Sequence, residues 1–151
     1  MDRLLPRFAP LAALALLAAA TPGRADSSAT ASLAVTVTGI KNAKGVIRLA
    51  LCPPDAGFPD CKTKVVRTAS LPISGGTASV TLTGLVPGRY AVSVFHDANS
   101  NNKLDTFAGI PKEGYGFSRN PGFKPRAPKF SEAEVQVQGT STAAIKLRYI
   151  L

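Results

Sequence analysis

Apolar and polar residues alternate in seven short segments of this 151-residue chain, and this period of two constrains the fold more than any other feature. Within each alternating segment, β-branched and other apolar residues are separated mostly by Thr, Ser, Lys, Arg or Ala. Such a pattern is typical of β-strands that bury one face. Gly and Pro clusters stand between several of the segments, as turns between strands require. The segments are 33–38, 45–51, 65–71, 77–82, 89–95, 133–138 and 143–149.

Short strands with hairpin-length connections, and no helical periodicity between them, favour two packed antiparallel sheets. We therefore predict an all-β fold for residues 32–151. The expected architecture is a seven-stranded antiparallel β-sandwich, Ig-like or transthyretin-like, with one long Gly/Pro-rich loop. A chain of this length forms a single domain. The predicted core residues are Val35, Val37, Ile47, Leu49, Leu51, Val80, Leu82, Val92, Val94, Val135, Val137, Ile145 and Leu147.

A Pro-Gly turn precedes Tyr90 at the start of the fifth predicted strand, in the stretch Leu85-Val86-Pro87-Gly88-Arg89-Tyr90. In sandwich folds a Tyr at such a corner buries its ring and bonds its hydroxyl to backbone near the turn. The stretch therefore supports the sandwich prediction. It is a fold signal and carries no chemistry.

The first 25 residues have the layout of a secretory signal peptide. Arg3 and Arg7 form a basic start, residues 9–20 are an almost unbroken Ala/Leu run, and small residues precede a cleavage point after Ala25. The apolar run is shorter than the roughly 20 residues of a membrane-spanning helix; a retained membrane anchor is the alternative. We predict a signal peptide over 1–25, a flexible mature N-terminus over 26–31, and an exported bacterial protein, periplasmic or secreted, that does not span the membrane once processed.

Cleavage would remove Arg3, Arg7, Arg24 and Asp2, so the formal charge would fall from +9 to +7. A basic exported protein is attracted to anionic envelope components such as lipopolysaccharide or acidic glycans. Solubility alone is the simpler explanation of the charge. Nucleic acid is not an expected partner, because the chain is exported and has no aromatic-rich basic motif of the RNA-binding kind. We expect a monomer.

The two cysteines, Cys52 and Cys61, stand close together in the stretch L-C-P-P-D-A-G-F-P-D-C. In an exported chain such a pair predicts a disulfide that closes a short loop. A zinc site is the alternative, but only His96 remains to complete one.

The segment 97–131 interrupts the strand pattern and contains eight Gly or Pro residues between positions 109 and 128. A loop of this length inside a compact domain is usually functional or internally held. We expect no regular structure within it, and we expect it to carry whatever function the protein has.

The segment begins with an Asn/Asp-rich stretch that resembles a cation-binding loop of the D-x-[DN]-x-[DN] kind. Calcium prefers oxygen ligands from carboxylates, amides and backbone carbonyls. In such a loop, Asp97, Asn99 and Asn101 would point inward. Lys103 would offer its carbonyl and Asp105 its carboxylate. Calcium is therefore the one cofactor that the sequence suggests.

Other features of the stretch depart from a calcium loop. Ala108 stands at position twelve, where a bidentate Glu is usual, although Glu113 would supply a carboxylate if the chain doubled back. Asn102 replaces the usual Gly at position six and tolerates positive φ. The alternative is a metal-free turn in which Asp and Asn side chains bond to backbone amides.

His96 stands immediately before this stretch. A hydrolase centred on His96, Asp97 and Glu113 is one hypothesis, with Ser118 or Ser131 as nucleophile. No G-x-S-x-G stretch and no second His support it. A His that closes a strand and bonds a loop carbonyl is the commoner arrangement, so we expect no enzymatic activity.

The stretch 109–118 mixes glycines with Tyr115 and Phe117. These aromatic residues would either pin the loop onto the scaffold or line a sugar or peptide cleft. The basic, Pro-rich stretch 124–130 follows and would either bind an anionic partner or be solvated.

The central run V-F-H-D-A-N-S-N-N-K-L-D-T-F-A-G-I-P-K-E-G-Y-G-F-S resembles the hallmark of an exported bacterial family of unknown function, number twenty-one forty-one. The strand that leads to Cys52 and the corner at Tyr90 match the family as well. The resemblance implies export and a small β-sandwich, and it implies no enzyme activity. It also suggests a functional patch of His96, Asp97, Asn99, Asn101, Asp105, Glu113, Tyr115 and Phe117. The leading hypothesis is a non-enzymatic module whose long loop binds calcium or an envelope partner, and the alternative is an adaptor that binds anionic polymers through its basic face.

Overall fold

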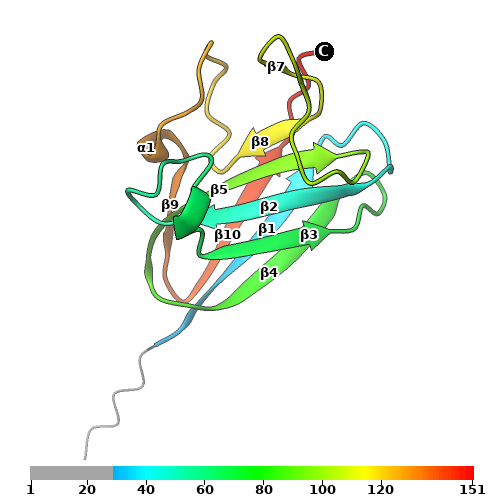
Figure 1. Cartoon of the computed structure of the whole chain (residues 1–151). Helices are drawn as coiled ribbons and strands as arrows, with labels where there is room; N and C mark the ends of the chain where they lie inside the picture. Colours follow the sequence, from blue (N-terminus) through cyan, green and yellow to red (C-terminus); the bar gives the residue numbers. More distant parts are fainter. Residues whose placement is uncertain (1–28) are drawn as a thin grey trace, which may run out of the picture.

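The computed structural model describes residues 29–151, so the predicted signal peptide lies outside the described residues (Figure 1). Almost every regular element is a β-strand, which confirms the all-β prediction. Two short helical turns are η1 (Lys62–Lys64) and α1 (Phe130–Ala133). The strands are β1 (Ala31–Thr38), β2 (Val46–Cys52), β3 (Arg67–Leu71), β4 (Ala78–Leu85), β5 (Gly88–Asp97), β6 (Thr106–Phe107), β7 (Ile110–Pro111), β8 (Tyr115–Phe117), β9 (Glu134–Val137) and β10 (Thr140–Lys146).

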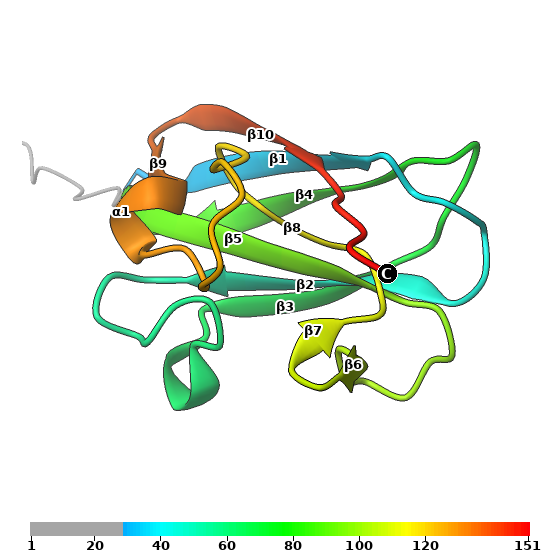
Figure 2. The same ribbon diagram turned by 90° about the horizontal axis from the view of Figure 1, so that it is seen from above.

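The strands form two main sheets and a small hairpin (Figure 2). The first sheet has the order β10-β1-β4, and the second has the order β3-β2-β5-β8, with β9 paired to the beginning of β5. Strands β6 and β7 pair only with each other. All seven predicted segments contain a strand, and β1 begins at Ala31, one residue before the predicted start of the domain.

One strand pair contradicts the prediction of an entirely antiparallel arrangement. Strands β1 and β10 run parallel, with Ser32 opposite Thr140 and Thr38 opposite Lys146. Strand β9 belongs to the other sheet, and the chain changes sheets at Gly139, where the backbone has a positive φ of 56°. The last strand therefore enters the first sheet in the same direction as β1.

The core lies between the two main sheets and comes from the inward positions of the alternating segments. Along β1, for example, Leu33, Val35 and Val37 are fully buried while Thr36 and Thr38 are exposed. Of the thirteen predicted core residues, eleven are buried, and the other two, Val80 and Val135, pack half-buried against the same core. Burial of apolar surface is the main force that holds such sheets together.

Two local predictions from the sequence are confirmed. The ring of Tyr90 is buried, and its hydroxyl donates a hydrogen bond to the carbonyl of Val86 at 2.7 Å, as the corner motif requires. Cys52 and Cys61 form a disulfide with their Cα atoms 5.8 Å apart, and both are buried. The disulfide closes the loop that carries Phe58.

The prediction that the segment 97–131 lacks regular structure is wrong. It contains the β6–β7 hairpin and strand β8, which extends the second sheet by pairing Phe117 with Ser93 and Tyr115 with Phe95. These three strands raise the strand count to ten, in place of the seven predicted. Pairing of a three-residue strand gives little periodic signal, so the Gly and Pro content dominated the prediction.

Strand β8 lies where the two sheets approach each other. Tyr115 and Arg148 exchange backbone hydrogen bonds of 3.0 and 2.8 Å, which link β8 to the chain just beyond β10. Gly116 in β8 and Gly114 immediately before the strand permit this approach. A Cβ at Gly116 would lie 2.7 Å from Cγ2 of Ile145, and one at Gly114 would overlap the ring of Tyr149. The Gly-Tyr-Gly-Phe stretch thus places its glycines against the scaffold and its aromatic residues on the other side.

Candidate functional site

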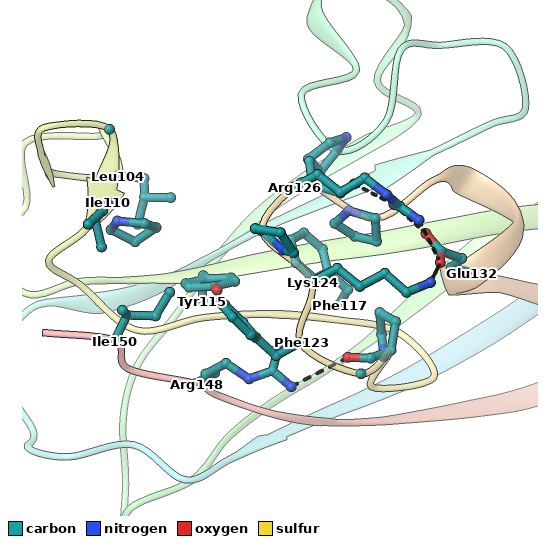
Figure 3. A pocket seen from close by; sticks show the side chains of 18 residues that line it. Leu104, Ile110, Tyr115, Phe117, Phe123, Lys124, Arg126, Glu132, Arg148 and Ile150 are labelled. Carbon is teal, nitrogen blue, oxygen red and sulfur yellow. Dashed lines mark hydrogen bonds and ion pairs between the residues drawn. The ribbon is translucent and has the colours of Figure 1, made fainter.

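A cleft of about 550 Å³ opens beside β8, between the β6–β7 hairpin and the segment 121–128 (Figure 3). Figure 1 shows these two loops rising on the same side of β8, with the C-terminus beside the hairpin. A volume of this size is in the range of small-molecule sites. The lining residues are Pro59, Leu104, Gly109, Ile110, Pro111, Tyr115, Phe117, Pro121, Gly122, Phe123, Lys124, Pro125, Arg126, Ala127, Pro128, Glu132, Arg148 and Ile150.

The two sides of the cleft differ in chemistry (Figure 3). Leu104, Ile110 and Ile150 gather on one side, and Lys124, Arg126 and Glu132 lie on the other, with Tyr115 between the two groups. Ile110 and Ile150 are 41% and 40% exposed, so part of each apolar side chain is accessible to solvent. The apolar side of the cleft is therefore open to a ligand.

Edge-to-face aromatic contacts support one wall of the cleft. The ring of Phe117 lies 5.8 Å from Tyr115 and 5.6 Å from Phe58, and Phe58 in turn lies 6.3 Å from Phe130, measured between ring centroids. Such contacts stabilise a loop on its scaffold beyond the area that they bury. We predicted that Tyr115 and Phe117 would either pin the loop or line a cleft. In the structure they contact each other, Phe117 contacts Phe58, and both residues line the cleft.

The carboxylate of Glu132 holds the two cations on the polar side. Arg126 donates to both of its oxygens, at 2.8 and 3.1 Å, and Lys124 donates to Oε1. The backbone amide of Lys129 donates to Oε2 at 2.7 Å. The hydrogen bonds from Arg126, and next those from Lys124, hold the pKa of Glu132 well below its usual range. Both cations are thus held by one carboxylate, and the group keeps a net charge of +1.

Arg148 lies between the two sides and has few partners. Its Nη2 donates to the carbonyl of Pro121 at 3.4 Å, and its guanidinium lies 5.6 Å from the centroid of the Phe123 ring. No carboxylate pairs with it within residues 29–151. The side chain is half-buried, so it is a cation without a counter-charge in the described part of the chain.

The Asn/Asp-rich loop contributes only Leu104 to the cleft lining and is organised around buried Asp97. One oxygen of this carboxylate accepts the amide of Asn101 at 2.9 Å, and the other accepts the amide of Asn102 at 3.0 Å and Nε of Arg48 at 2.8 Å. Burial acts to raise the pKa of Asp97, but the bonds from Arg48 and the two amides outweigh it. The pKa of Asp97 is therefore lowered.

A second set of bonds closes the rest of this loop. The side-chain amides of Asn99 and Asn101 both donate to the carboxylate of Asp105, at 2.7 and 2.9 Å. The side-chain oxygen of Asn101 accepts the amide of Lys103 at 2.9 Å. Glu113 returns on the β6–β7 hairpin and accepts the amides of Ala98 and Asp105, each at 3.0 Å.

The structure thus brings together the side chains predicted as calcium ligands. Asp97, Asn99, Asn101 and Asp105 share one loop, and Glu113 approaches it as the sequence suggested. Within residues 29–151, however, no group of three or more His, Cys, Asp or Glu side chains has the spacing of a metal site. Asn102 has a φ of 63°, as expected at the turn. Hydrogen bonds inside the protein account for the conformation of this loop.

His96 is only 1% exposed and has a partner at each ring nitrogen. Nε2 lies 2.7 Å from the carbonyl of Lys44, which only accepts, so Nε2 carries a proton. Nδ1 lies 2.9 Å from the hydroxyl of Tyr149, which itself accepts the amide of Lys41. The predicted alternative, a His that bonds a loop carbonyl, describes this arrangement.

The serines considered as nucleophiles are not next to His96 or in the cleft lining. Ser118 is buried, accepts the amide of Val92 at 2.9 Å and donates to the carbonyl of Ala133. The side chain of Ser131 is exposed on α1. Neither serine forms a hydrogen bond with His96 in the described structure.

Sequence reasoning missed the residues that give the cleft its character. Leu104 and Ile110 are single apolar residues in a polar loop, and Phe123 is isolated among Gly and Pro. Arg148 stands in a predicted strand at a position where Lys, Arg and Thr alternate with apolar residues. Nothing in its local sequence distinguishes it from a solvent-facing cation such as Lys146.

A family model described as "Uncharacterized protein conserved in bacteria (DUF2141)" matches residues 35–145. The chain belongs to this family. The match confirms the resemblance noted in the sequence and includes the Asn/Asp-rich loop and most of the cleft, ending before Arg148. No curated protein and no solved structure matches the chain. The family description names no activity. Separately, no helix within residues 29–151 is long and apolar enough to cross a membrane.

Proposed function

We propose that this protein is an exported, non-enzymatic binding module that holds a ligand or envelope component in the cleft beside β8. The observation that supports this proposal is the origin of the cleft lining. Fourteen of its eighteen residues come from the single long segment 97–131, which leaves the strand scaffold and returns to it. Long loops held on a rigid scaffold are where binding residues are usually found.

Binding fits the cleft better than catalysis. Its eighteen lining residues include no His, Cys, Ser, Thr or Asp, and the one carboxylate, Glu132, is bonded to two cations. The proposed hydrolase residues, His96, Asp97 and Glu113, each bond to neighbouring groups of the protein and do not line the cleft. No described contact therefore favours the hydrolase.

Export and the type of sandwich are parts of the same proposal. Disulfides persist in oxidising compartments such as the bacterial periplasm, so the bond between Cys52 and Cys61 supports export. The two face-to-face sheets and the corner at Tyr90 support an Ig-like or transthyretin-like scaffold. The parallel pairing of β1 with β10 is the feature that such an assignment has to accommodate.

Binding of a neutral apolar dye tests the proposal. N-phenyl-1-naphthylamine fluoresces in apolar surroundings, and we expect it to bind the folded protein in the cleft. Ile110→Asp places a carboxylate on the apolar side and should weaken dye binding at least about tenfold, because burying an unpaired charge is costly. Val86→Asp is the matched control, since Val86 is 74% exposed and lies outside the cleft lining. The proposal fails if the two variants bind the dye equally well.

Calcium binding by the loop 97–105 is a second candidate function. The observation in its favour is the return of Glu113, which places a further carboxylate beside Asp105 and its two Asn partners. A calcium ion would replace the amide groups that now bond to Asp105, and the Asn side chains would turn their oxygens toward it. With two Asp residues in the loop, a Kd of about 10⁻³ M is the expected scale.

Thermal unfolding with and without calcium tests this candidate. For a Kd near 1 mM, about 10 mM calcium stabilises the folded state by about 1.4 kcal/mol, which raises Tm by several degrees. Magnesium at the same concentration should have less effect, and Asp105→Asn should abolish the calcium response while it keeps the shape of the side chain. An unchanged Tm in the parent protein removes the candidate.

A further inference from the structure

The charges around the cleft are unbalanced. Its lining contains three cations, Lys124, Arg126 and Arg148, and one anion, Glu132. Glu132 is already committed to Lys124 and Arg126. One surplus positive charge therefore remains in the cluster of Lys124, Arg126 and Glu132. The other is at Arg148, which has no carboxylate partner in the described structure and faces the cleft between its polar and apolar sides (Figure 3).

We propose that the cleft binds a single-chain anionic amphiphile, with its carboxylate or phosphate on Arg148 and its alkyl chain against Leu104, Ile110 and Ile150. This inference rests on the proposed function, because it requires that the cleft holds a ligand at all. It adds the chemical class of that ligand and the residue that selects it.

The side chain of Arg148 has unused hydrogen-bond donors. A guanidinium has five N–H donors in a planar fork, and only Nη2 has an acceptor within residues 29–151, the Pro121 carbonyl at 3.4 Å. Half-burial removes part of its hydration without providing a counter-ion. A carboxylate or phosphate would accept two of the remaining donors in parallel, the geometry that makes such pairs strong.

Arg148 is also held in position before any ligand arrives. Its backbone exchanges two hydrogen bonds with Tyr115, and its guanidinium lies near the ring of Phe123. Binding therefore orders few additional groups, which lowers the entropic cost of association. Arg126, in contrast, would have to give up its bonds to Glu132 before it could bind an anion in the same way.

Charged and apolar surfaces are separated within this one cleft. The aliphatic side chains lie together across Tyr115 from Lys124 and Arg126 (Figure 3). A ligand with a charged head at one end and a hydrocarbon tail at the other matches both sides at once. A polymer that carries only charge would leave the exposed Ile110 and Ile150 uncovered. A cationic amphiphile would meet the surplus positive charge.

Carboxylate and phosphate headgroups share the chemistry that Arg148 recognises, so both are tested, as single molecules rather than as a bilayer. The probes are dodecanoate, dodecyl phosphate, dodecanol and dodecyltrimethylammonium, each kept below its critical micelle concentration and titrated by calorimetry. We expect dodecanoate or dodecyl phosphate to bind about tenfold or more tightly than dodecanol. The cationic probe should bind more weakly than the alcohol.

The variant Arg148→Gln separates head recognition from tail binding. It should lose the preference for the anion while it binds dodecanol and N-phenyl-1-naphthylamine as the parent does. Arg148→Lys keeps the charge without the planar fork and should show an intermediate preference. Arg67→Gln is the matched control, because Arg67 is an exposed arginine outside the cleft lining, and it should bind all four probes as the parent does.

Other outcomes overturn the inference. If the parent protein binds the dye but shows no preference for the anionic probes, the anionic amphiphile is rejected and the proposed function stands. If the parent protein binds neither the dye nor the anionic probes, the amphiphile and the proposed function are both rejected. A preference for the anionic probes that Arg148→Gln and Arg148→Lys leave unchanged would place the anion elsewhere. Binding only to phosphatidylglycerol vesicles, and not to single amphiphiles, would show a membrane-surface interaction instead.

Discussion

The Asn/Asp-rich loop and most of the cleft lining both come from the segment 97–131, but the arginines that they contact differ in how many hydrogen-bond partners they have. In the loop, Arg48 bonds to buried Asp97 and to Ser70. In the cleft, Arg148 has one carbonyl and one aromatic ring as partners. The first arginine is a structural residue with its charge matched inside the protein. The second has unused hydrogen-bonding capacity that faces a cavity.

The two arginines show which polar groups of the protein are structural and which are available to a ligand. The loop was the more conspicuous feature of the sequence because carboxylates and amides gather in it. Asp97 nevertheless uses both oxygens on its own protein, and no buried side-chain nitrogen or oxygen in residues 29–151 lacks a partner. A saturated network mainly stabilises a conformation, whereas an unsaturated cation beside apolar surface is suited to a ligand.

The largest expected effect is that of removing the carboxylate at the centre of the loop. Asp97→Ala leaves Arg48 without its counter-charge and deprives two backbone amides of their acceptor. Breaking a buried pair in this way should lower the free energy of unfolding by about 3 kcal/mol, measured by denaturant titration. Arg148→Gln should change it by less than about 0.5 kcal/mol, because no ion pair within the described structure depends on Arg148.

Asp97→Asn is the matched control for this prediction. It keeps the shape of the side chain and one acceptor oxygen, so its effect on the free energy of unfolding should fall between those of Asp97→Ala and the parent. The comparison breaks down if Arg148→Gln proves as destabilising as Asp97→Ala. Arg148 would then be a structural residue, and its open donors would carry no information about a ligand.

The sequence predicted most of the scaffold because alternation is a local signal. Val35 and Val37 read as inward residues of a strand, and the structure buries both. The corner at Tyr90 and the disulfide were likewise visible in short stretches of sequence. Strand β8 was not predicted because its position beside β5 requires glycine at positions 114 and 116. This requirement comes from the close approach of Tyr149 and Ile145, which are distant in the sequence.

The candidate site was predictable only where it is local. The polar stretch from Asp97 to Asp105 is continuous, so its mutual contacts were foreseeable, and the return of Glu113 was a conditional prediction. The cleft brings together residues that are distant in the sequence, such as Pro59, Leu104 and Ile150. The position of Arg148 and Ile150 in the cleft depends on β10 joining the first sheet after β9 has paired in the second. No residue pattern in the sequence predicted this change of sheet.

A smaller effect is expected at the disulfide, which supports the cleft from one side. Replacing Cys52 and Cys61 together by Ala should lower the free energy of unfolding by about 2–3 kcal/mol, because the closed loop no longer restricts the unfolded chain. Dye binding in the cleft should also weaken, since the loop carries Phe58 against Phe117. Denaturant titration and dye titration measure the two effects. Unchanged dye affinity in the folded double variant would show that the cleft wall does not depend on this loop.

The smallest expected effect is on the acid dependence of the free energy of unfolding. It compares a carboxylate of the loop, Asp97, with a carboxylate of the cleft, Glu132. Asp97 and Glu132 both have lowered pKa values, so each contributes stability that is present above its unfolded pKa, near pH 4, and is lost as the pH falls through its folded value. Below pH 4 the free energy of unfolding should therefore decline. Asp97→Asn and Glu132→Gln should each make that decline shallower. Because Asp97 is buried and the partners of Glu132 are exposed, about 0.5 M NaCl should suppress the contribution of Glu132 and spare that of Asp97. Equal salt sensitivity of the two variants would show that the loop and the cleft do not differ electrostatically in the way described.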